Sequence, residues 1–172
     1  MTDAERAVYA FLDETGIAYH SLSHARVSAI EDCLPIAERL GGVVPRNYFL
    51  APRNQSEFYL LLAHPDSVFR TSSVSRQAGA SRLMFAPEDA LSRLLHTYPG
   101  AVSPLGLMFE SAKDVRLLVD RRLLNEETLV FHPLENTASV AMRGEDFFGT
   151  FLRAVCKPYT LVDMEQKGDI HA

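Results

Sequence analysis

The chain has 172 residues, 47% of them hydrophobic and 23% charged, with a formal net charge of −5. These values are typical of one globular domain with a sizeable core, and the acidic balance argues against a protein that coats long nucleic acid. No apolar run approaches the roughly 20 residues that a membrane-spanning helix needs. Two cysteines, and an N-terminus without the basic and apolar parts of a secretory signal, predict a cytoplasmic protein with reduced thiols.

The predicted elements are short helices interleaved with short strands. A Thr-x-x-Glu capping box predicts an amphipathic helix over residues 2–14, and a Ser-x-x-Glu box predicts a second helix from residue 28 that Pro35 interrupts. Further helices are expected at residues 71–77, 87–96 and 145–155. Strands are expected at residues 17–22, 47–51, 57–63, 82–85, 115–119, 128–131, 137–142 and 159–162.

The strongest strand signals are residues 47–51 and 57–63, which flank a turn-rich segment and predict an antiparallel hairpin. Short strands between short helices indicate a single α+β domain over residues 1–172, built around a mixed sheet. The last polar residues, 165–172, are expected to be a frayed tail.

Charge is unevenly distributed along the chain. Six arginines and four acidic residues lie between Arg46 and Arg93, a local charge of +2, so the rest of the chain carries −7. A local basic face on an acidic protein favours a partner with a few phosphates over a long duplex. Scattered arginines without a common role explain the same count equally well.

Two glycines and two prolines lie within the nine residues 99–107. Glycine allows backbone conformations and close approaches that other residues do not, and proline makes the backbone rigid. Such a loop can present peptide N–H and C=O groups to a ligand. A tight turn before a strand is the simpler alternative.

Three segments together resemble a known family. Arg46–Leu50 is similar to a Lys-Asn-Leu-Phe-Leu strand, Gly100–Leu107 to a Gly-x-Val-Ser-Pro-Phe-Gly-Leu loop, and Phe131–Ser139 to a Phe-His-Pro-x-x-Asn-Thr-Ala segment. His24 falls where that family has a His-Pro pair before a gating helix. From about Tyr19 to Asp163 the chain resembles the trans-editing aminoacyl-tRNA deacylases of the YbaK/ProX type, relatives of the editing domain of bacterial prolyl-tRNA synthetases. Its motifs are most similar to the branch that deacylates alanyl-tRNA(Pro).

The resemblance implies a mixed, mostly antiparallel, curved β-sheet flanked by short helices. It also implies hydrolysis of the aminoacyl ester of mischarged alanyl-tRNA(Pro) by a positioned water, with stabilisation by backbone groups and without metal or cofactor. The expected partner is the tRNA acceptor end, with prolyl-tRNA synthetase as a second candidate and neither DNA nor membrane. The implied catalytic residues are Arg46, Asn47, Gly100 and His132. The implied substrate-binding residues are His24, Ala101, Val102, Ser103, Pro104 and Gly106.

Two positions depart from the family pattern, since Arg46 replaces a lysine and Ala25 replaces a proline. Arginine keeps the charge and binds phosphate, but it is bulkier and planar. Either the role survives with altered geometry, or the substrate is another mischarged tRNA, such as seryl- or cysteinyl-tRNA. A non-catalytic module that binds an acceptor end or a synthetase is the third hypothesis.

Single residues also have competing interpretations. Ser103 with His132 suggests a nucleophile and its base, but the Gly-x-Ser-x-Gly pattern is absent and hydrogen bonding is favoured for Ser103. His132 is either a pocket wall or a packed structural histidine. His20, His24 and Cys33 fit no zinc spacing.

Aromatic and aliphatic side chains near the hairpin are interpreted mainly as core. Four residues are expected in the core rather than in a base-stacking surface: Phe49, Tyr59, Leu61 and Phe85. Tyr48 lies on the opposite strand face from Phe49 and fits either role.

Overall fold

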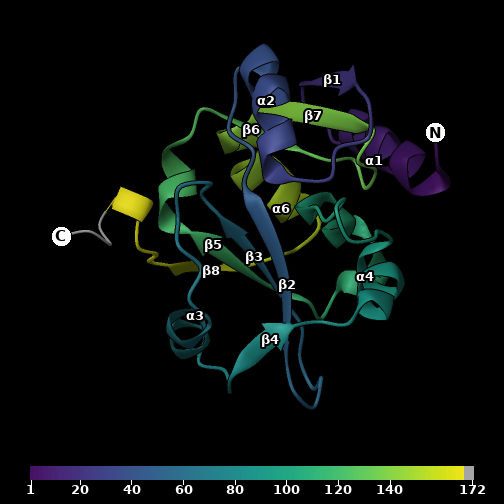
Figure 1. Ribbon diagram of the computed structural model, residues 1–172. Helices are drawn as coiled ribbons and strands as arrows, with labels where there is room; N and C mark the ends of the chain where they lie inside the picture. Colours follow the sequence, from purple (N-terminus) through teal and green to yellow (C-terminus); the bar gives the residue numbers. More distant parts are fainter. Residues whose placement is uncertain (169–172) are drawn as a thin grey trace.

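Two β-sheets form the frame of the computed structural model, which describes residues 1–168 (Figure 1). The larger sheet has the order β4 (Leu83–Phe85), β2 (Arg46–Pro52), β3 (Tyr59–Ala63), β5 (Arg116–Asp120), β8 (Tyr159–Val162). The smaller sheet has the order β1 (Tyr19–Ser23), β7 (Ala138–Arg143), β6 (Thr128–Phe131). Only β3–β5 and β5–β8 pair in parallel among these strands. The α+β class and the mostly antiparallel pairing are confirmed, but the strands divide between two sheets.

Helices cover the faces and edges of this frame. They are α1 (Asp3–Glu14), α2 (Leu34–Leu40), α3 (Thr71–Gln77), α4 (Glu88–Leu95), α5 (Gly144–Asp146) and α6 (Leu152–Ala154). A π-helical turn, Phe147–Phe151, joins α5 to α6, so the three form the predicted closing helix. Short 3₁₀ segments lie at Ile30–Cys33, Pro104–Met108, Glu110–Ala112 and Arg121–Asn125. Within residues 1–168, no helix is long and apolar enough to cross a membrane.

The N-cap expected at Thr2 is confirmed, whereas the cap expected at Ser28 is wrong. The Thr2 hydroxyl accepts a hydrogen bond from the Glu5 N–H at 3.1 Å, as expected at the start of α1. At the second site the Asp32 carboxylate is the cap, accepting from the N–H groups of Ser28 and Ala29 at 3.2 Å each. A carboxylate is the stronger acceptor, and it reaches back over the 3₁₀ turn that precedes α2.

The larger sheet is buried on both faces, because alternate residues of β3 enter different apolar clusters. Leu60 and Leu62 face the main core, with α1, the closing helix and the smaller sheet. Tyr59 and Leu61 face a second cluster beneath α3. Side-chain alternation along a strand produces this division.

Phe85 departs from the predicted core positions. Phe49, Tyr59 and Leu61 are buried as expected, but Phe85 is 66% exposed. The physical reason is that β4 is a three-residue edge strand, which pairs only with the far half of β2.

The predicted frayed tail lies partly against the domain. The Val68 N–H donates to the Glu165 carbonyl at 2.8 Å, and the Lys167 N–H donates to the Asp66 carbonyl at 2.9 Å. Residues 165–167 are therefore paired with the loop before α3, whereas 169–172 lie outside the described residues.

Lys157 is a buried cation that joins two separate parts of the chain. Its ammonium donates to the carbonyls of Ala112, Lys113 and Val115 at 3.1, 2.9 and 2.6 Å. These bonds use all three ammonium hydrogens and fasten the entry to β5 against the turn before β8.

We expect Lys157→Met to lower the free energy of unfolding by about 2–4 kcal/mol, because it leaves buried carbonyls without a donor. Chemical denaturation measures this change. Lys113→Met is the matched control, since the Lys113–Glu110 ion pair is exposed and its loss costs less than about 1 kcal/mol. Equal destabilisation by the two substitutions would contradict this assignment.

Candidate active site

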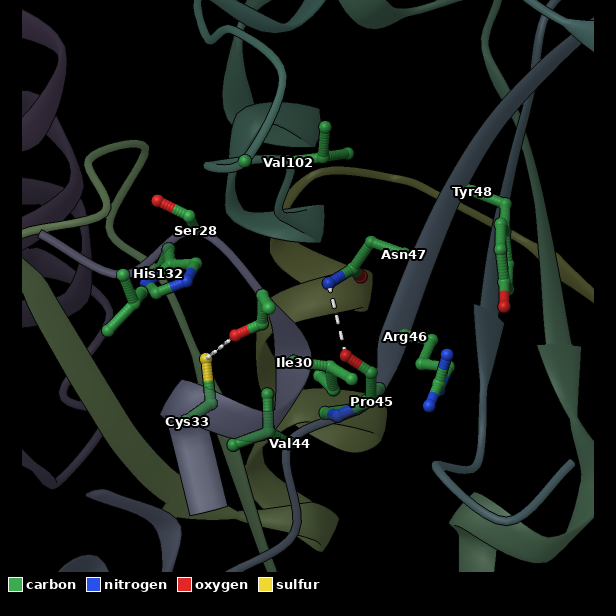
Figure 2. Close-up of a pocket in the computed structure, with 13 residues that line it drawn as sticks. Ser28, Ile30, Cys33, Val44, Pro45, Arg46, Asn47, Tyr48, Val102 and His132 are labelled. Carbon is green, nitrogen blue, oxygen red and sulfur yellow. Dashed lines mark hydrogen bonds between the residues drawn. The ribbon is translucent and has the colours of Figure 1, made fainter. Parts of the chain in front are cut away.

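A pocket of about 220 Å³ opens where the smaller sheet approaches the first residues of β2 (Figure 2). Four separate segments line it: residues 27–33, residues 44–48, the Pro/Gly loop at Gly100 and Val102, and His132 after β6. The structure therefore brings Arg46, Asn47, Gly100, Val102 and His132 to one cavity, although 86 positions separate the first from the last.

Neighbouring residues of β2 point to opposite sides of the strand. The Asn47 side chain points toward the pocket, whereas the Arg46 and Tyr48 side chains lie on the other side of β2, at the pocket rim (Figure 2). The Asn47 amide nitrogen donates to the Pro45 carbonyl at 3.3 Å. Its Oδ1 is buried and has no hydrogen-bond partner among residues 1–168. An unpaired buried acceptor is costly, so this oxygen is suited to a donor on a ligand.

His132 faces the pocket as a neutral imidazole. Its Nδ1–H donates to the Ala138 carbonyl at 2.9 Å, which leaves Nε2 as the acceptor nitrogen. Burial lowers the pKa of His132; the Ala138 carbonyl opposes this shift, and the neighbouring His24 adds to it. His132 is thus a pocket wall with a free lone pair.

His24 neighbours His132 but does not belong to the pocket lining. The two rings are 6.2 Å apart between centroids, and the His24 Nε2 lies 2.9 Å from the Ser139 hydroxyl. The geometry thus favours a supporting position for His24 over the predicted contact with substrate. No group of three or more metal-ligating side chains occurs within the described part of the chain.

The Pro/Gly loop contributes only part of its predicted surface. Gly100 has a φ of +94°, which favours glycine, and no hydrogen bond from the N–H of Gly100 or Val102 is recorded within residues 1–168. By contrast, Ala101, Ser103, Pro104 and Gly106 are buried and do not border the pocket.

Contacts of these buried residues hold the Pro/Gly loop in its conformation. The Ser103 hydroxyl accepts from the Leu105 N–H at 3.2 Å, capping the 3₁₀ segment. A Cβ at Gly106 would lie 2.6 Å from the Leu95 carbonyl oxygen, so glycine lets the loop approach the end of α4. We therefore revise the expected direct substrate contact of Ala101, Ser103, Pro104 and Gly106 to a supporting role.

Asn136, the asparagine of the Phe-His-Pro-x-x-Asn segment, was expected near the pocket without an assigned role, and it connects two of the pocket walls. Its side-chain Nδ2 donates to the Val27 carbonyl at 2.9 Å, and its backbone carbonyl accepts from the Val27 N–H at 3.1 Å. Its Oδ1 lies 3.0 Å from the Tyr98 hydroxyl, just before the Pro/Gly loop. The only sequence signal for this role is an asparagine four residues after His132, in the Phe-His-Pro segment.

Comparison with known proteins identifies the family of the chain. The model of the aminoacyl-tRNA editing domain family matches residues 24–149, a span that contains every lining segment. The chain belongs to this family. The predicted enzyme class of this editing domain, an aminoacyl-tRNA deacylase, is confirmed at the family level.

Two relatives and one solved structure illustrate the range of similarity to this editing domain. The prolyl-tRNA editing protein ProX of Acetoanaerobium sticklandii is 32% identical over 144 residues, covering 84% of this chain and 88% of the relative. The prolyl-tRNA synthetase associated domain-containing protein 1 of Danio rerio is 28% identical over 146 residues, covering 84% and 79%. A solved structure described as a candidate trans-editing enzyme for prolyl-tRNA synthetase matches with a TM-score of 0.71. At 14% identity over 96% of this chain and 99% of that one, it supports the fold alone.

The lowered pKa of His132 makes stability depend on pH. The folded pKa lies below the ordinary value of 6.5, so below that pH the unfolded chain binds more protons than the native protein. We expect the free energy of unfolding to fall from pH 7.5 to pH 5, and to fall less in His132→Gln. Denaturant titrations at several pH values measure both. An unchanged pH dependence in the variant would contradict a lowered pKa of His132.

Proposed function

We propose that the protein hydrolyses the aminoacyl ester of alanyl-tRNA(Pro) in trans, after the mischarged tRNA has left its synthetase. The observation that carries the proposal is that one small pocket is lined both by Asn47, whose buried Oδ1 has no partner among residues 1–168, and by a neutral His132. An aminoacyl ester carries an α-ammonium group next to its carbonyl, and this donor matches the free amide oxygen.

The reaction needs little covalent machinery, because an aminoacyl ester is already activated. A positioned water attacks the ester carbonyl, and the terminal ribose oxygen leaves with a proton. His132 Nε2 is available to accept a hydrogen bond from that water or from the free ribose hydroxyl. The N–H groups of Gly100 and Val102 are the candidate donors to the developing oxyanion.

A serine nucleophile is not favoured. Ser103 is fully buried, and its hydroxyl caps the 3₁₀ segment instead of bordering the pocket. The backbone N–H groups of the Pro/Gly loop are therefore better placed than the Ser103 hydroxyl to take part in ester hydrolysis.

Selection of alanine is attributed to the apolar pocket wall. Four aliphatic side chains belong to the pocket lining: Val27, Ile30, Val44 and Val102. A wall of this kind accepts a methyl group and excludes the proline ring by collision. The synthetase, which must hold proline, cannot strongly reject a smaller amino acid by binding alone.

Arg46 is assigned to the phosphates of the acceptor end rather than to the ester. Its side chain lies across β2 from Asn47 and has no ion-pair partner among residues 1–168. An unpaired guanidinium at a pocket rim suits a phosphodiester that approaches from outside.

A panel of charged tRNAs tests the function directly. We expect deacylation of alanyl-tRNA(Pro) at least ten times faster than that of prolyl-tRNA(Pro), because the pocket wall excludes the ring. Release of labelled amino acid, corrected for spontaneous hydrolysis, measures each rate.

Preferred release of serine or cysteine would transfer the same chemistry to another mischarged tRNA. Binding of tRNA with no release of any amino acid would instead identify a non-catalytic module and contradict the proposal.

A further inference from the structure

Three aromatic rings form a cluster on the face of β2 opposite Asn47: Tyr48, Phe69 and Phe85. Tyr48 stacks on Phe69 with centroids 4.4 Å apart and planes 12° from parallel. The Phe85 ring lies 6.2 Å from Tyr48 and 5.9 Å from Phe69. Phe85 is 66% exposed, so its ring has partners on one side and solvent on the other.

The sheet and the loop before α3 hold these rings in place. Phe85 pairs with Leu50, two residues along β2 from Tyr48, so both rings project from the same face. The loop that carries Phe69 is anchored by buried Asp120, which accepts from the His64 N–H at 3.0 Å and from the Ser67 hydroxyl. The outer face of the aromatic cluster is therefore a preformed platform.

The aromatic cluster is continuous with the proposed ester pocket. Tyr48 belongs to both, because it borders the pocket rim and stacks in the cluster. Arg46 lies on the same side of β2 as Tyr48 (Figure 2), and its buried Nε has no hydrogen-bond partner among residues 1–168. An unpaired cation on the same strand face as the aromatic cluster favours a ligand that has both a phosphate and a planar base.

We propose that the aromatic cluster is a stacking site for the base that precedes the terminal adenosine of the acceptor end, with Arg46 at the intervening phosphate. The inference rests on the proposed function, which puts the terminal ester in the pocket. The bases of a single-stranded end have free faces, and stacking on aromatic side chains is how such ends are bound. The unpaired charge favours this occupant over an apolar protein segment.

Two alanyl esters of different length separate this site from the catalytic pocket. Alanyl-tRNA(Pro) presents the preceding base, whereas the alanyl ester of adenosine alone does not. Phe85→Ala is expected to lower kcat/KM for alanyl-tRNA(Pro) by roughly 5- to 100-fold, the range for loss of one stacked base, and to leave alanyl-adenosine unchanged. Phe85→Trp should retain activity on both esters.

Tyr159→Ala is the matched control, because Tyr159 is a 37% exposed ring on β8, at the opposite edge of the same sheet (Figure 1). Tyr159→Ala should leave kcat/KM unchanged for both esters. An equal decrease of kcat/KM for both esters in Phe85→Ala, or a decrease for neither, would overturn the inference.

A binding measurement keeps this inference separate from the proposed function. Fluorescence anisotropy with an uncharged single-stranded oligoribonucleotide ending in CCA does not depend on hydrolysis. Weaker binding by Phe85→Ala supports stacking, even if the parent protein cleaves neither ester and the proposed function fails. Unchanged binding overturns the stacking site. So does a Phe85→Ala variant that keeps RNA binding but no longer co-elutes with prolyl-tRNA synthetase, which would identify a protein-docking surface.

Discussion

The alternation of side chains along β2 decides which groups reach the pocket and which reach the outer face of the sheet. Arg46 and Asn47 are adjacent in sequence, but successive side chains of a strand leave its opposite faces. Asn47 therefore enters the cavity between the sheets, while Arg46 and Tyr48 meet the outer face. A one-residue shift in the pairing of Arg46 with Ala63 would exchange these roles, so the antiparallel hairpin determines the chemistry.

The other walls of the pocket depend on long-range polar contacts. Asn136 fastens the segment at Val27, and the close approach at Gly106 sets the Pro/Gly loop against α4. These residues do not meet the proposed substrate, yet they fix the distance between His132, Gly100 and Asn47. A site that acts through positioned water and peptide groups needs such rigid support, because it has no reactive side chain to compensate for poor geometry.

Local features were predictable from the sequence, and pairings that join distant segments were not. The hairpin of β2 and β3 and the N-cap at Thr2 need only neighbouring residues, and both are confirmed. The division into two sheets depends on the pairing of β1 with β7, which more than a hundred residues separate. The motif resemblance named Arg46, Asn47, Gly100 and His132, which line one cavity, and also Ser103 and Gly106, which do not border it. The difference was not predictable, because burial depends on what packs behind a loop. The exposure of Phe85 was not predicted for the same reason, since an apolar residue in a short strand does not indicate whether other elements pack over its side chain.

We propose that the Asn47 amide oxygen receives the α-ammonium group of the aminoacyl ester, and a structure of the protein with a non-hydrolysable analogue, 3′-alanylamino-adenosine, would show whether it does. We expect the α-nitrogen within about 3.2 Å of Asn47 Oδ1 and the methyl group against Val27 and Val102. An α-nitrogen bound elsewhere, with Asn47 Oδ1 still unpaired, would mean that this amide does not recognise the ester.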